Sequence, residues 1–148
     1  MNDEPSPPAV APRARRQRGL LAGLAAFASV LLAIIGIRFL ILPEDATRTF
    51  GLGGKPLASS LDAAIGLRDL WLAGLGLAFA WLRDWRALAL WLGLGSAVCF
   101  GDAVIVIRHG ISPAAVAFHV ASGVFCAVVG WRCWRLALKD RSGRDGAP

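Results

Sequence analysis

Apolar residues along this chain are gathered into four long runs separated by shorter polar connections. The runs cover residues 19–42, 62–82, 87–107 and 113–138. Each run is long enough for a membrane-spanning helix, which needs about 20 mostly apolar residues. Because the connections are short, successive helices are expected to be neighbours. The pattern therefore predicts an all-α, polytopic membrane protein whose four transmembrane helices form an antiparallel bundle.

The segments outside these runs are predicted to be tails and loops. Residues 1–18 contain four prolines and then four arginines, so this tail is expected to be disordered and cytoplasmic. Residues 139–148 form a second cytoplasmic tail, which leaves residues 19–138 as the membrane domain. The longest connection is the outer loop of residues 43–60, where Pro43 is expected to end the first helix.

The basic residues follow the topology of a membrane protein. Eleven of the 16 lysines and arginines precede the first run, separate the second run from the third, or close the chain. Arg48, Lys55 and Arg108 are the basic residues on the opposite side. Since cytoplasmic loops carry the excess of positive charge, both termini are predicted to be cytoplasmic and the protein to lie in the inner (plasma) membrane. The net charge of +6 therefore does not indicate a nucleic-acid partner.

Five ionisable residues interrupt the apolar runs: Arg38, Arg68, Asp69, Asp102 and His119. A charge in hydrocarbon is costly unless it is paired or hydrated, so such residues are functional candidates. At 1.5 Å per residue, Arg38, Arg68, Asp102 and His119 lie about 6–9 Å from the outer ends of their helices, and Asp69 lies one residue deeper than Arg68. One shared depth, in the outer third of the bilayer, favours a one-sided pocket over a path across the membrane.

Helical spacing separates these five residues. In the second run a stripe of small and acidic residues follows one helix face: Asp62, Gly66, Asp69, Ala73, Gly76 and Ala80. Such stripes are typical of faces that meet other membrane helices, and Asp102 and His119 lie on similar stripes. Arg38 points away from the stripe of its helix and is shallow enough to reach the headgroups. Arg68 is about 100° around the helix from Asp69, so each is expected to find a partner on another helix or in water.

Arg108 and His109 are expected to mark the outer interface, and Arg48 the outer loop. The alternative is that these three residues line the mouth of the pocket. The three cysteines, Cys99, Cys126 and Cys133, all fall within the runs and have no metal-ligand spacing. Their odd number argues against a disulfide framework, and we interpret them as small apolar residues. No metal and no cofactor is predicted.

The ordered motifs around these residues carry a resemblance to a known family. They are Gly36-Ile37-Arg38-Phe39 running to Pro43, then Arg48 and Phe50-Gly51, then Gly66-Leu67-Arg68-Asp69, then Gly101-Asp102-Ala103 with Arg108-His109-Gly110, and finally His119. Over about residues 22–136 the chain resembles the small four-helix membrane proteins of domain of unknown function family 4267. The resemblance implies the four-helix fold and brings no established activity.

Two roles fit the five intramembrane residues. One is binding or transport of a small polar or amphipathic molecule, such as a lipid headgroup, an anion or a quinone-like ring. The alternative is a structural or accessory subunit whose buried charges only hold the bundle together, at roughly 0.6–2 kcal/mol per contact. Catalysis is least favoured, because the chain has no HExxH, no GxSxG and no metal-spaced Cys or His set. The lipid bilayer is the expected surrounding, and small-residue faces on all four helices leave room for a homodimer.

Overall fold

A computed structural model describes residues 12–54, 59–109 and 112–145 of the chain. Within these residues there are four long helices, α1 (Pro12–Ile41), α3 (Ser59–Leu82), α4 (Trp85–His109) and α5 (Pro113–Asp145), and a short helix, α2 (Pro43–Phe50). Each long helix is apolar and long enough to cross a membrane. The predicted fold class, an all-α protein with four membrane-length helices, is thereby confirmed.

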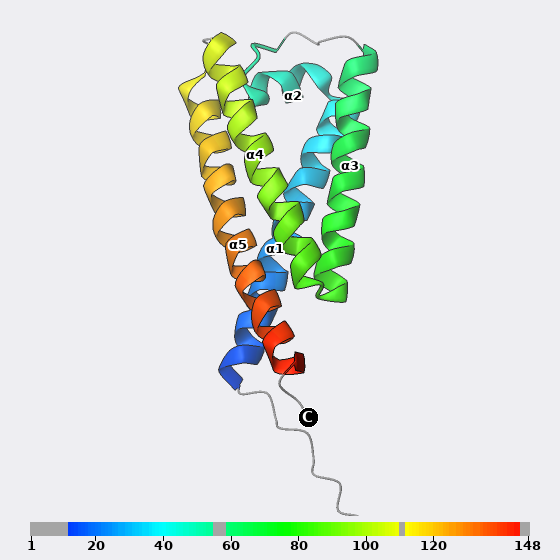
Figure 1. Cartoon of the computed structure of the whole chain (residues 1–148). Coiled ribbons are helices and arrows are strands. Elements are labelled where there is room, and N and C mark those ends of the chain that lie inside the picture. The colour runs from blue at the N-terminus through cyan, green and yellow to red at the C-terminus, as the bar shows by residue number, and fades with distance from the viewer. Residues whose placement is uncertain (1–11, 55–58, 110–111, 146–148) are drawn as a thin grey trace, which may run out of the picture.

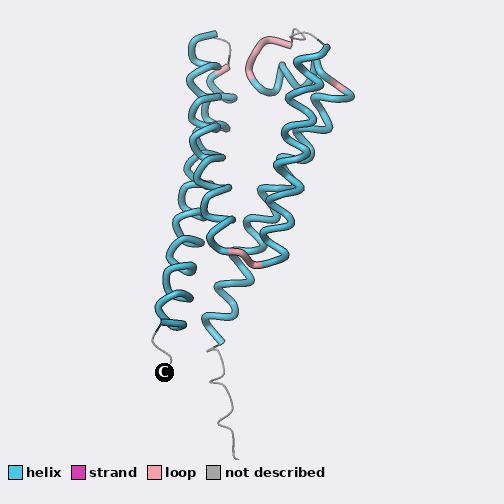
Figure 2. Tube along the Cα trace, turned by 45° about the vertical axis from the view of Figure 1, so that its right-hand side comes forward, coloured by secondary structure: helices cyan, strands magenta, loops and turns pink. Residues whose placement is uncertain are grey.

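The long helices are arranged as two pairs, with α1 packed on α3 and α4 packed on α5. The pairs meet toward the end where α1 begins and α5 ends, and they diverge toward the other end (Figure 1 and Figure 2). Helix α2 lies across the diverging end, between the two pairs (Figure 1). We refer to these as the terminal end and the α2 end of the molecule.

The α1–α3 pair is held at close distance by two glycines that face each other. A Cβ atom on Gly36 would lie 2.8 Å from the carbonyl oxygen of Gly66, and one on Gly66 would lie 2.7 Å from the carbonyl oxygen of Gly36. Small residues of this kind let membrane helices approach backbone to backbone. The predicted stripe of the second run is therefore the face of α3 that meets α1, and it carries Asp69 to within van der Waals contact of Gly36.

At the terminal end all four long helices contribute to one apolar core. Its most buried side chains include Ala25 on α1, Ala80 on α3, Leu88 and Leu92 on α4, and Cys133 on α5. Burying these side chains removes apolar surface from lipid or water and fixes the pairs against each other by close packing. This core explains why the pairs converge here and not at the α2 end.

The tails differ from the sequence expectation within the described residues. Helix α1 already begins at Pro12, a residue type favoured at the first helical position, and α5 continues to Asp145. Arg18 forms a bidentate ion pair with Asp140, with Nη1 3.1 Å from Oδ2, so the two helix extensions are joined to each other. Residues 1–11 and 146–148 lie outside the described part of the chain.

The outer connection, predicted to be a loop, contains helix α2. Leu42 separates the end of α1 from α2, and Pro43 is the first residue of α2. Glu44 and Asp45 stand in its first turn, where negative charge favours a helix N-terminus. Gly51 ends it in a left-handed conformation with φ of 106°, and its N–H donates to the carbonyl oxygens of Thr47 and Arg48. The helix was missed because it is only eight residues long.

Candidate functional site

Helix α2 is attached to the α4–α5 pair through its last turn. The Nε2 atom of His119 lies 3.2 Å from the carbonyl oxygen of Phe50, and the two rings meet edge to face with centroids 4.7 Å apart. Because a carbonyl oxygen only accepts hydrogen bonds, Nε2 of His119 carries the proton. The next residue is Gly51, where a Cβ atom would lie 2.7 Å from Val106 Cγ1 and 2.9 Å from Ala115 Cβ. Glycine at this position lets the end of α2 fit between α4 and α5.

On α3 the candidate pair Arg68 and Asp69 interacts directly. Both Nε and Nη2 of Arg68 donate to Oδ1 of Asp69, at 3.0 and 2.9 Å. The expectation that each finds its partner on another helix or in water is wrong. The side chains leave the helix about 100° apart, but the long arginine side chain folds around the surface and reaches the neighbouring carboxylate. Asp69 is 4% exposed, whereas the side chain of Arg68 is 57% exposed.

Asp102 on α4 lies near both this pair and His119. It is partly buried on α4, and its electrostatic neighbours are His119 on α5 and Arg68 and Asp69 on α3. Among the described residues no side chain or backbone group donates a hydrogen bond to Asp102. Four of the five predicted residues, contributed by three helices, therefore lie near one another beneath α2. We call Arg68, Asp69, Asp102 and His119 the polar group.

Arg38, the fifth predicted residue, has different partners. Its Nη2 atom forms an ion pair with the carboxylate of Asp45 and lies 2.8 Å from Oγ1 of Thr49. Both partners are exposed residues of α2, so Arg38 links the end of α1 to the exposed side of α2. Its place at the rim agrees with its helical phase, which points away from the α1 stripe.

The predicted mouth residues lie at the surface of the α2 end. Arg48 is exposed on α2, where its Nε atom lies 3.1 Å from the position that a Cβ atom on Gly54 would occupy. Arg108 is exposed near the end of α4. The side chain of His109 is outside the described part of the structure. The two described arginines can attract an anionic group at the surface, but the structure gives them no contact with the polar group.

Asp62 is a buried acidic residue that was not among the predicted site residues. It lies in the first turn of α3, is 2% exposed, and neither of its carboxylate oxygens has a hydrogen-bond partner. It shares the buried face of α3 with Gly66 and Asp69, and it stands about 10 Å nearer the α2 end than Asp69. Asp62 belongs to the stripe of small and acidic residues in the second apolar run. It was interpreted as the first residue of a membrane span and not as a buried charge.

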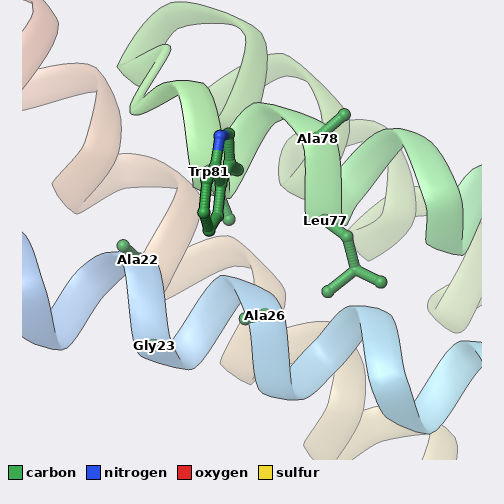
Figure 3. A pocket seen from close by; sticks show the side chains of 7 residues that line it. Ala22, Gly23, Ala26, Leu77, Ala78 and Trp81 are labelled. Atoms are coloured by element: carbon green, nitrogen blue, oxygen red, sulfur yellow. The ribbon is translucent and has the colours of Figure 1, made fainter.

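An apolar hollow of about 560 Å³ lies elsewhere, between α1 and α3 near the terminal end (Figure 3). It is lined by Ala22, Gly23 and Ala26 on α1 and by Leu77, Ala78, Ala80 and Trp81 on α3. Trp81 is twelve residues from Asp69, which is about 18 Å along the helix. Its lining has no ionisable side chain, so this hollow offers no charge to a ligand, unlike the polar group.

The described residues contain no set of three or more His, Cys, Asp or Glu side chains placed to hold a metal ion. The buried and partly buried acidic residues of the α2 end, Asp62, Asp69 and Asp102, are spread over α3 and α4, and one of them, Asp69, is already bound by Arg68. What the arrangement offers is a set of hydrogen-bond acceptors and one partly exposed guanidinium within a helical, otherwise apolar surrounding. Such a set can hold a small charged or polar group by direct contact.

Comparison with known proteins gives one match. Residues 29–133 match the model of a family described as Domain of unknown function (DUF4267). The matched region runs from Ser29 in α1 to Cys133 in α5, and it includes α2, Asp62 and the whole polar group. No curated protein and no solved structure matches the chain.

Proposed function

Since the chain belongs to the DUF4267 family, whose description assigns no activity, we propose a function from the residues that its helices gather. The protein binds a small polar or amphipathic molecule within the membrane, at the polar group beneath α2. Binding of this kind is also the first step that transport would need. In the orientation that we propose, the termini are cytoplasmic, the α2 end faces outward across the inner membrane, and lipid surrounds the long helices.

The observation that carries this proposal is the incomplete pairing of the polar group. Three helices bring Arg68, Asp69, Asp102 and His119 near one another, yet Asp102 receives no hydrogen bond from the described residues. An ionisable side chain inside a membrane is costly, and an unsatisfied one adds the loss of its hydrogen bonds. The guanidinium of Arg68 is also more than half exposed, so it can contact a bound molecule while it holds Asp69.

A structural role is the second candidate, and two contacts favour it. His119 is fixed by the carbonyl oxygen of Phe50, and Arg68 is fixed by Asp69, so both of these side chains already have protein partners. A bundle held together by its polar side chains would show this kind of pairing throughout. Asp102 is the residue that separates the two roles, because binding leaves it free for a ligand and a structural role requires it to be paired.

The test is native mass spectrometry of the protein purified in a mild neutral detergent, comparing the wild type with Asp102→Asn. We expect the wild type to retain a non-protein mass that Asp102→Asn loses, while the melting temperatures of the two proteins stay within about 3 °C. Glu44→Gln, which changes an exposed carboxylate on α2, is the matched control and should retain the mass. A wild type without any retained mass, together with a strongly destabilised Asp102→Asn, would support the structural role and contradict binding.

A further inference from the structure

We infer that the ligand of this site is an organic ammonium ion with an apolar portion. The inference rests on the proposed binding function and names the class of ligand that the same site takes. It follows from the balance of charges inside the α2 end and from the side chains that border the polar group.

Among the residues that the structure describes, the interior of the α2 end holds more carboxylates than cations. Arg38 is engaged by Asp45 at the rim, and Arg48 and Arg108 are exposed, so none of these three arginines neutralises a buried acid. The interior acids are Asp62, Asp69 and Asp102, and the interior bases are Arg68 and His119. Arg68 is bound to Asp69, which leaves two carboxylates, those of Asp62 and Asp102, and one histidine. A bound cation restores the balance, whereas a bound anion would increase the excess.

Asp62 is the second observation, and it is independent of the polar group. The side chain is 2% exposed and both oxygens are without a hydrogen-bond partner, although it lies on the same buried face of α3 as Asp69. A buried carboxylate without a partner is unfavourable, and a counter-charge beside it lowers that cost. It lies about 10 Å closer to the α2 end than Asp69, along the same face of α3.

The surroundings favour an organic cation over a metal ion. The described residues offer no set of three metal ligands, whereas aromatic rings border the histidine. The ring of Phe50 is 4.7 Å from that of His119, the ring of Phe118 is 5.8 Å away, and Phe39 meets Phe50 edge to face at 6.3 Å. Aromatic faces attract ammonium groups and also bury apolar surface. An amine that carries an apolar group would match carboxylates and aromatic rings at the same end of the molecule.

The experiment uses three probes of one shape and different charge: 2-phenylethylamine, 2-phenylethanol and 3-phenylpropionate, added at pH 7 to the purified full chain in neutral detergent. A ligand that binds the folded state raises the melting temperature in a saturable manner. We expect the amine alone to do so, and we expect the apparent Kd to rise about tenfold or more in Asp62→Asn and in Asp102→Asn, because each loses one charge partner. Glu44→Gln should respond like the wild type.

Three results would overturn the ammonium assignment: stabilisation by 3-phenylpropionate in place of the amine, no stabilisation by any probe, or an amine effect that is unchanged in both aspartate variants. Melting each variant without a probe shows whether it is folded. The native mass measurement keeps the two proposals apart. A retained mass that carries no amine contradicts the ammonium class and leaves binding standing, whereas no retained mass and no probe effect contradict both.

Discussion

At the scale of single residues, Asp62 is the group whose energetics are least balanced. Its position in the first turn of α3 gives it a favourable interaction with the helix dipole, worth about 0.3–1 kcal/mol. Leaving a buried polar group without hydrogen bonds costs about 1–3 kcal/mol, and more for a charged one. The cost of burial exceeds the gain from the helix dipole, so Asp62 lowers the free energy of unfolding. Residues that lower stability in this way are common at functional sites.

We therefore expect Asp62→Asn to raise the stability of the unliganded protein by about 1 kcal/mol, because the amide keeps the shape of the side chain and removes its charge. The measurement is thermal unfolding in neutral detergent without any added ligand. Asp45→Asn is the control, since it breaks an exposed ion pair with Arg38 and should change stability by less than about 1 kcal/mol. A clear loss of stability in Asp62→Asn would mean that its carboxylate has a partner that stabilises the fold.

Helical phase, read from the sequence, predicts which side chains lie on the buried face of a helix but not which side chains pair. The small-residue stripes placed Asp69 and His119 on buried faces, and both are buried. Phase did not determine the Arg68–Asp69 pair, because the reach of an arginine side chain exceeds the separation of the two Cβ atoms. Nor did it reveal that Arg38 would be engaged by Asp45, since that contact depends on a helix that was predicted to be a loop.

At the scale of secondary structure, α2 links the two helix pairs at the end where they diverge. Ala46 and Thr47 are buried, and the Phe50 carbonyl oxygen and Gly51 attach its end to α5 and α4. The long helices could be predicted because an apolar run of about 20 residues has few other interpretations. The eight residues of α2 are too few to show a clear helical periodicity. Its ends are nevertheless marked by a proline and two acidic residues at the start and a glycine after the last turn.

The α1–α3 contact can be tested through its glycines. Gly66→Ala places a Cβ atom 2.7 Å from the Gly36 carbonyl oxygen and from Leu40 Cγ, so we expect a loss of about 1–3 kcal/mol in unfolding free energy from overpacking. Gly74→Ala is the matched control on the same helix, because nothing lies within 4 Å of its Cβ position. Equal melting temperatures for the two variants would contradict the close approach of α1 and α3.

The α4–α5 contact can be tested through its cysteines. Cys99 on α4 and Cys126 on α5 are neighbours across the contact between the two helices. In a Cys133→Ser background we expect one mercury(II) ion to bridge them, which intact-mass measurement detects as one added metal and two blocked thiols. The single variants Cys99→Ser and Cys126→Ser are the controls and should not form the bridge. Two independent mercury adducts in the parent would contradict the facing arrangement.

At the scale of the whole molecule, both ends of the described chain lie at the terminal end, opposite α2 (Figure 1). The charge distribution predicts that this end is cytoplasmic, and the Arg18–Asp140 ion pair adds a link between α1 and α5 there. The number of membrane-length helices could be predicted from the apolar runs. Their division into two diverging pairs could not, because it depends on which stripes meet, and all four runs carry similar stripes.

Orientation is tested by fusing a reporter enzyme that is active only outside the cytoplasm. A fusion after Pro148 should be inactive, and an insertion between Gly53 and Gly54, next to α2, should be active, because the excess of arginine and lysine retains the terminal end in the cytoplasm. Expression of both fusions is checked by immunoblotting. An active fusion at Pro148 would contradict the orientation and would place the polar group on the cytoplasmic side.

The measurement that tests the binding site most directly is an experimental map of the protein purified in mild detergent, at a resolution that shows side chains. We expect non-protein density beneath α2, in contact with Asp102 and within reach of Arg68 and Asp69. A map in which α3, α4 and α5 close on one another, with Asp102 accepting hydrogen bonds from protein groups and no further density beside it, would contradict the binding site and leave the polar group a structural feature of the fold.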